Sequence, residues 1–217
     1  SLFAELYDEE GTPPRAARLP AVHSQQILEV LRRFSDQPQR LADLEGTFST
    51  VMWDENQERQ EGTIRRETQF IDDVSDWVIS GAHFYVGTPL YKTPREGCSH
   101  NQDYDSLDLT GLPANYIPRT NFVPACNNEE YYRRMPVVPW EGESGSQKPV
   151  TDYYRFVNRR MIGASLQRSL IPAIIPPETS HLNTIFGTVF RNKWDLVNFA
   201  GSVASFPSDF FFKSTGR

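Results

Sequence analysis

Apolar positions along the chain predict a mixture of short helices and short strands. Ile27, Leu28, Leu31 and Phe34 recur at helical spacing, and Ser24 stands where it can cap a helix over residues 25–34. Other segments are rich in β-branched and aromatic residues, which favours strands. The predicted strands lie at residues 50–53, 79–86, 170–175 and 184–190, and a second helical pattern spans residues 194–206.

The segments between these elements are polar or rich in proline. Residues 54–63 are polar, residues 96–150 show little periodicity, and residues 141–148 form a polar loop. Strands and helices alternate without a regular βαβ rhythm, so we predict an α+β fold with a mixed sheet, flanking helices and long proline-rich loops. We place an acidic linker or helical segment at residues 1–75 and the main domain at residues 76–217.

One stretch, residues 155–183, combines four arginines with a strongly apolar run. Arg155, Arg159, Arg160 and Arg168 come before or beside the apolar residues 170–175. We expect a basic, helix-like segment that leads into a buried strand and then into a polar loop. Such an order would hold cationic side chains on a rigid base.

Charge is distributed unevenly over the 217 residues, whose formal net charge is -6. Residues 1–80 carry 8 basic and 16 acidic side chains, whereas residues 148–217 carry 9 basic and 4 acidic ones. The plain interpretation is ordinary surface charge. The alternative is that the basic C-terminal part meets an anion such as nucleic acid.

Motifs of common enzymes are absent from the sequence. It has no G-x-G-x-x-G loop, no phosphate-binding lysine loop and no G-x-S-x-G turn. Cys98, His100 and Cys126 do not have the spacing of a zinc site, so we predict no metal. No apolar run is long enough for a membrane helix. With only two cysteines, a reducing cytoplasmic location is expected.

Basic residues instead recur beside aromatic and small polar residues. Lysine and arginine neutralise phosphates, and arginine, asparagine and glutamine can bond to base edges. Each cluster also has a plain structural explanation, because arginine stems cover apolar surface and tyrosines fill cores. The clusters lie at residues 91–95, 116–121, 153–155, 158–160 and 190–193.

Several strings resemble the C-terminal region of large bacterial adenine-specific DNA methyltransferases. These enzymes occur in fused type II restriction–modification systems and in phage-defence systems such as DISARM. The strings cover residues 83–95, 104–109 and 116–124, then residues 167–177 and 181–184, and finally residues 194–213. Ser169 stands where this family is expected to have threonine. The resemblance covers residues 75–217 and implies a fold like that of a target recognition domain.

The resemblance implies sequence-specific binding of double-stranded DNA beside the catalytic methyltransferase domain of the same parent chain. The sequence lacks the glycine-rich loop for S-adenosylmethionine and the Asn/Asp-Pro-Pro-aromatic motif at the flipped adenine. We therefore expect no catalytic residue and no cofactor here, with S-adenosylmethionine bound by the catalytic half. The expected DNA-binding residues are Lys92, Arg95, Arg119, Asn121, Arg159, Arg160, Arg168, Asn183, Arg191 and Lys193.

Two other functions remain open at this point. The chain could be a protein–protein docking module of a phage-defence complex, with the acidic residues 1–80 bound to another subunit. It could also be a hydrolase or nuclease that uses His181, Asp209 and Lys213, although these residues show no motif spacing.

Overall fold

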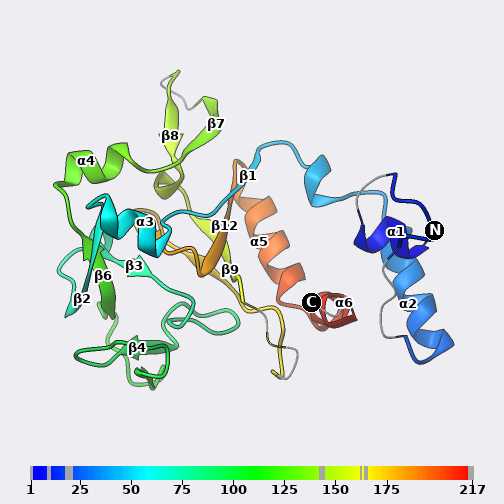
Figure 1. The fold of residues 1–217 in the computed structure, drawn as a ribbon, viewed down its shortest axis with the longest axis horizontal. Helices are drawn as coiled ribbons and strands as arrows, with labels where there is room; N and C mark the ends of the chain where they lie inside the picture. Colours follow the sequence, from blue (N-terminus) through cyan, green and yellow to red (C-terminus); the bar gives the residue numbers. More distant parts are fainter. Residues whose placement is uncertain are drawn as a thin grey trace. The chain divides into compact units, whose positions relative to one another are not determined.

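The computed structural model describes residues 2–8, 11–17, 22–141, 145–161, 163 and 166–214. Helices and strands are interspersed along the chain, which confirms the α+β class (Figure 1). The chain divides into two compact units. The smaller unit comprises residues 1–45, 162–170 and 205–217, and the larger unit comprises residues 46–161 and 171–204.

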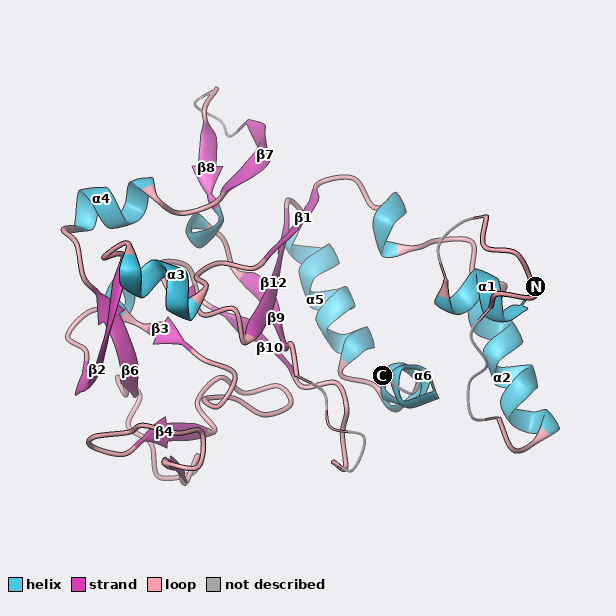
Figure 2. Ribbon diagram, viewed as in Figure 1, coloured by secondary structure: helices cyan, strands magenta, loops and turns pink. Residues whose placement is uncertain are grey.

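The larger unit contains a four-stranded antiparallel sheet in the order β1-β12-β9-β10 (Figure 2). Arg155 at the start of β9 lies opposite Val189, and Arg159 at its end lies opposite Ile185. The end of β9 therefore lies beside the start of β12. The four strands are β1 (Thr47–Thr50), β12 (Ile185–Phe190), β9 (Arg155–Arg159) and β10 (Pro172–Ile175).

The two faces of this sheet are both covered. Helix α5 (Lys193–Val203) packs on one face, where Phe156 and Phe190 meet Leu196. Since side chains alternate along a strand, Val157 of β9 points to the other face. There it joins Ala173 and Ile175 of β10 in a second apolar cluster. This double burial explains why the sequences of β10 and β12 are nearly continuous apolar runs.

Smaller two-stranded sheets and short helices complete the larger unit. Three of the sheets are antiparallel, and β3 and β11 pair in parallel. The pairs are β2 (Ile64–Phe70) with β6 (Arg119–Pro124), β4 (Lys92–Pro94) with β5 (Tyr104–Ser106), β7 (Val137–Glu141) with β8 (Gln147–Pro149), and β3 (Val78–Ile79) with β11 (Ser180–His181). The helices are α3 (Glu55–Gln60) and α4 (Asn128–Arg133), with 3-10 turns η2 (Val74–Asp76) and η3 (Val150–Asp152).

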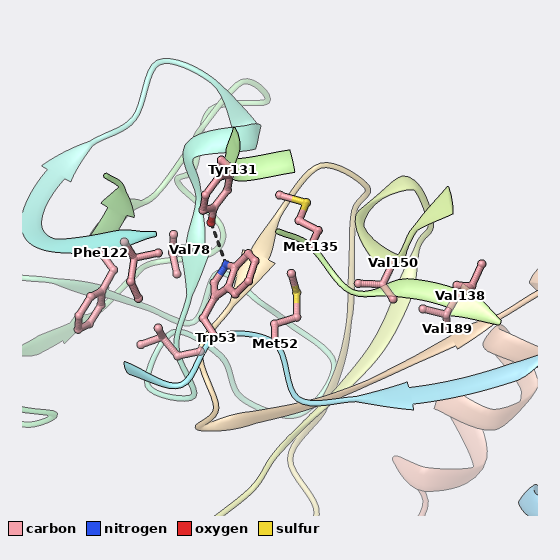
Figure 3. Packing of buried hydrophobic residues seen from close by; sticks show 11 residues of the cluster. Met52, Trp53, Val78, Phe122, Tyr131, Met135, Val138, Val150 and Val189 are labelled. Carbon is pink, nitrogen blue, oxygen red and sulfur yellow. Dashed lines mark hydrogen bonds between the residues drawn. The ribbon is translucent and has the colours of Figure 1, made fainter. Parts of the chain in front are cut away.

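Trp53 occupies the centre of one buried cluster of the larger unit (Figure 3). Its indole Nε1 donates to the hydroxyl of Tyr131 at 2.9 Å, and that hydroxyl lies 2.6 Å from Ser180 Oγ. Met52 and Met135 flank the two rings in the same cluster. This contact fastens α4 to the chain that follows β1 and to β11.

The smaller unit is helical in the part that the structure describes. Phe34 packs on Phe211 with ring centroids 4.9 Å apart, and Leu31 is fully buried. The unit therefore gains its core from residues far apart in the sequence. Its elements are α1 (Leu2–Tyr7), α2 (Gln25–Ser35), the 3-10 turn η1 (Leu41–Asp43) and α6 (Phe206–Ser214).

Two predicted elements agree closely with the structure. Helix α2 begins after Ser24, whose side chain accepts a hydrogen bond from the backbone N–H of Ile27 at 3.3 Å. Strand β12 covers residues 185–190 of the predicted strand at 184–190. The strand predicted at residues 170–175 is present from Pro172 onward.

The segment that begins at Arg155 is a strand, so the prediction of a helix-like segment was wrong. Arg155 and Val157 face one side of the sheet and Phe156 faces the other, which is a β pattern. The strand predicted at residues 79–86 ends at Ile79. It ends there because His83 Nδ1 accepts the N–H of Ser80 and closes a turn.

Other predicted boundaries were also wrong. The strand expected at residues 50–53 ends at Thr50, and the helical pattern over 194–206 is interrupted between α5 and α6. The polar residues 54–63 contain α3, and the irregular region 96–150 contains four strands and α4. Within the predicted loop 141–148, residues 142–144 lie outside the described residues. The compact units also do not follow the predicted boundary near residue 75.

Candidate nucleic-acid interface

Arg159 and Arg160 form a basic edge at the end of β9. Arg160 is exposed and Arg159 is half-buried. Neither side chain forms an ion pair with any residue that the structure describes. Burial lowers the pKa of the Arg159 guanidinium, but an arginine remains protonated at neutral pH. These two consecutive arginines of the basic edge are therefore available to an external anion.

Hydrogen bonds and close packing hold the end of β9 beside Thr184 and Gly81. The backbone N–H of Arg160 donates to the carbonyl of Thr184 at 2.9 Å, and the hydroxyl of Thr184 accepts the N–H of Gly81 at 3.0 Å. A Cβ on Gly81 would lie 3.4 Å from Cγ of Arg159, so glycine leaves room for the arginine stem. Arg159, Gly81 and Thr184 are thus packed together.

Thr184 is also one of the residues that line a polar hollow of about 230 Å³. It lies within the larger unit and is built from segments far apart in the sequence, including α3, β2, β6 and the loop before β5. Most of its lining groups are hydroxyls, amides or charged side chains. The lining residues are Glu55, Arg66, Ser80, Ser99, His100, Asn101, Tyr104, Asn121, Phe122, Leu182 and Thr184.

The walls of the polar hollow are held by hydrogen bonds. Arg66 Nη2 donates to the carbonyls of Cys98 and Ser99, and its guanidinium lies 5.8 Å from the ring centroid of Phe122. Asp103 accepts the backbone N–H groups of Ser99 and His100 at 2.9 and 2.8 Å. These two N–H bonds lower the pKa of the Asp103 carboxyl. The loop that carries Asn101 is therefore anchored at both ends.

Asn121 lies in the wall of the polar hollow and not on an outer surface. It is 4% exposed, and its Oδ1 accepts the hydroxyl of Thr68 at 2.7 Å. The expected DNA contact of Asn121 stays a prediction, but the structure restricts how a base could approach it. Only a group that enters the polar hollow can reach this amide.

Three other predicted DNA-binding residues lie in or directly after β4 and β6 and make internal contacts. Lys92 Nζ lies 5.7 Å from the ring centroid of Tyr91, and the Arg119 guanidinium lies 4.6 Å from that of Phe70. Arg95 Nε bonds to Asp105 at 2.8 Å in an exposed pair. Exposed ion pairs are weak and screened by salt, so Arg95 stays available to another anion.

Arg191 and Lys193 lie at the far end of β12 from the basic edge. Arg191 follows the end of β12, whereas Arg159 lies opposite the first residue of that strand. Both side chains are exposed. Arg191 and Lys193 therefore lie at the opposite end of β12 from Arg159 and Arg160.

Arg168 and Asn183 are engaged within the protein. Arg168 lies in the smaller unit, where its Nε is 3.6 Å from Asp209 Oδ1 and its guanidinium is 4.9 Å from the Phe206 ring centroid. Asn183 Nδ2 donates to Asp54 Oδ2 at 2.6 Å. We therefore correct the assignment of both as primary DNA contacts.

Replacing Asp209 with alanine is expected to destabilise the smaller unit by about 2–3 kcal/mol. Asp209 is buried, and its Oδ1 accepts the N–H groups of Ser169 and Leu170 at 2.6 and 2.8 Å. The substitution leaves both buried donors without a partner. Urea denaturation measures the loss, and hydrogen exchange at the two amides locates it.

The control for this prediction is Asp209→Asn, which keeps an acceptor oxygen but removes the charge near Arg168 and Lys213. We expect a smaller loss than for Asp209→Ala. Equal stability of the alanine variant and the unchanged protein would contradict the assigned role.

Arg155 is buried inside the sheet and serves the fold. Its Nη1 lies 3.1 Å from Met52 Sδ, and its Nη2 donates to the hydroxyl of Thr179 at 3.1 Å and to the Thr179 carbonyl. Burial lowers the pKa of Arg155 to about 9. The sequence pattern places Arg155 beside Arg159 and Arg160, whereas Arg66, which belongs to none of the basic clusters, lines the polar hollow.

The residues of the alternative hydrolase do not form an active site. His181 is fully buried, and burial together with the charge of Arg155 lowers its pKa to about 3. The Asp209 carboxylate is occupied by two backbone N–H groups. Among the described residues, no three His, Cys, Asp or Glu side chains are grouped as metal ligands.

Comparisons with known proteins add no family assignment. Scans against protein-family models, curated proteins and solved structures found no match to this chain. Within the described part of the chain, no helix has the length and apolar character needed to span a membrane. The case for a function therefore rests on the residues, their geometry and the resemblance of the sequence strings.

Proposed function

We propose that this chain is a DNA-recognition domain of an adenine-specific DNA methyltransferase of a restriction–modification or phage-defence system. One observation carries the proposal: two consecutive arginines, with no ion-pair partner among the described residues, lie beside a polar hollow rich in hydroxyls and amides. The resemblance of residues 75–217 to this family agrees with it. The catalytic and S-adenosylmethionine-binding half would lie elsewhere in the parent protein.

In this proposal, the basic edge provides affinity. Arg159 and Arg160 neutralise neighbouring phosphates and release their counterions, which makes binding sensitive to salt. Arginine suits this role because its planar guanidinium can bond to phosphate through two N–H groups. The amides and hydroxyls of the polar hollow lie next to this edge, where they can contribute specificity.

Salt titration of the double variant Arg159→Gln/Arg160→Gln tests the proposal. Each phosphate contact contributes about 0.9 to the slope of log affinity against log salt concentration. We therefore expect the slope for a fluorescent duplex to become shallower by about 1.8, with weaker binding at low salt. Fluorescence anisotropy with the 217-residue chain measures both quantities.

The matched control is Arg32→Gln/Arg33→Gln, which removes two exposed, adjacent arginines from α2. The control should keep the slope of the unchanged protein. If both double variants behave alike, the charge of the whole chain and not the basic edge determines binding.

A docking module is the second candidate function, and exposed apolar residues on α5 favour it. Trp194 is 74% exposed and Val197 is 52% exposed, one helical turn apart. Such residues are enriched at protein interfaces. Exchange of residues 81–217 between related enzymes separates the two functions, because only a recognition domain would transfer the DNA target sequence.

A further inference from the structure

The polar hollow has the charge balance of a site for a neutral ligand. Arg66 and Glu55 both line it, so its formal charges offset each other. The Nη2 group of Arg66 is also occupied by the carbonyls of Cys98 and Ser99. A phosphate would meet the Glu55 carboxylate and an arginine that is already hydrogen-bonded, whereas hydroxyl and amide groups make up much of the remaining lining.

The size and walls of the polar hollow suit a small planar heterocycle. Its volume of about 230 Å³ lies below the roughly 300–1,000 Å³ of pockets for drug-sized ligands. Tyr104, Phe122 and Leu182 supply aromatic and apolar surface, and Asn101 and Asn121 supply amides. Burial raises the pKa of Tyr104 to about 12, so its hydroxyl stays neutral. Proteins read an extruded nucleobase with this combination of apolar packing and edge hydrogen bonds.

The position of the basic edge adds the phosphate contacts that such a base requires. Thr184 lines the polar hollow, and its carbonyl and hydroxyl are bonded to the backbone N–H groups of Arg160 and Gly81. Arg159 lies across Gly81. The polar hollow therefore lies next to the segment that carries both arginines, which can meet the phosphates of a nucleotide whose base enters it.

We propose that the polar hollow holds one nucleobase that has left the base stack, an inference that rests on the proposed binding of DNA by the basic edge. Asn121 is fixed in the wall by Thr68, and asparagine pairs well with the N6 and N7 atoms of adenine. An unpaired adenine is therefore the probe that should detect the site.

Three duplexes of the same flanking sequence test this inference. The first is fully paired, the second carries one bulged adenine, and the third carries a bulged deoxyribose without a base. Neither bulge needs unpairing energy, and only the bulged adenine places a base in the polar hollow. We therefore expect it to bind about tenfold tighter than the abasic bulge, a difference of about 1.4 kcal/mol. The abasic duplex controls for bending at the bulge.

Asn101→Ala is the main variant, because Asn101 is exposed on a loop and its loss should not affect folding. It should reduce the preference for the bulged adenine over the abasic bulge. Asn121→Ala should have the same effect, with urea denaturation as a check on its stability, since Asn121 is buried.

The outcomes separate this inference from the proposed function. Equal affinity for the adenine and abasic bulges overturns the base pocket, while the salt slopes of the arginine variants still test DNA binding. A preference for adenine that survives both asparagine substitutions also overturns it, because another surface must then hold the base. Failure of every duplex to bind overturns both.

Discussion

Replacing Trp53 with alanine is expected to lower the free energy of unfolding by about 3–5 kcal/mol. Trp53 is 2% exposed and packs among the buried residues around Met52, Val78 and Tyr131 (Figure 3). The substitution leaves a cavity in this cluster and also removes the donor to the Tyr131 hydroxyl. Urea denaturation of the two proteins measures the difference.

Two further variants show where the effect originates. Trp53→Phe keeps an aromatic ring but removes the Nε1–H donor, so we expect a smaller loss of about 1–2 kcal/mol. Trp194→Ala removes the same side chain from a position that is 74% exposed on α5, and a change below about 0.5 kcal/mol is expected. Equal losses for Trp53→Ala and Trp194→Ala would refute the assigned core.

A shift from pH 7 to pH 5 is expected to destabilise the protein by about 4 kcal/mol through two buried histidines. Burial lowers the pKa of His83 to about 4, and burial with the charge of Arg155 lowers that of His181 to about 3. In the unfolded chain each histidine has a pKa of about 6.5. The unfolded state therefore binds more protons as the pH falls below 6.5, and each histidine contributes a loss of about 2 kcal/mol by pH 5.

The hydrogen bonds of His83 agree with a neutral ring. Its Nδ1 accepts the N–H of Ser80 at 3.0 Å, and its Nε2 donates to the carbonyl of Arg119 at 3.2 Å. A proton on Nδ1 would oppose the Ser80 N–H group. The stabilising contribution is thus complete above pH 6.5 and falls until the pH reaches the folded pKa near 4.

Urea denaturation at pH 7 and pH 5 measures this dependence. In His181→Gln, the loss between the two pH values should shrink by about 2 kcal/mol, whatever the substitution does to stability at pH 7. The same substitution at exposed His23 is the control. A pH dependence that His181→Gln leaves unchanged would show that His181 is not buried in its neutral form.

Local sequence signals predicted some elements well. Ser24 and the apolar positions of residues 25–34 specify α2 through a cap and a helical period, both of which act within a few residues. The apolar run of β12 is similarly local. Residues 155–159 were misjudged because a short run with two basic residues carries no clear period, and its strand character comes from pairing with β10 and β12.

The candidate site depends on contacts that the sequence does not reveal. Arg159 and Arg160 were found because basic residues are visible in any sequence. Arg66 was missed because it belongs to the acidic half and meets the loop at residues 98–101 only through folding. Arg168 and Asn183 were assigned to DNA because their internal partners, Asp209 and Asp54, are far away in the sequence and meet them only through folding.

The location of a bound duplex tests the central claim most directly. Hydrogen exchange of the 217-residue chain, with and without a saturating duplex, maps the surface that DNA covers. We predict increased protection in peptides that cover residues 158–161 and 182–186, where Arg159, Arg160 and Thr184 lie, and unchanged exchange in α4 (Asn128–Arg133). A bound duplex that protects α4 or the β7–β8 hairpin and leaves residues 158–161 unchanged would contradict the account.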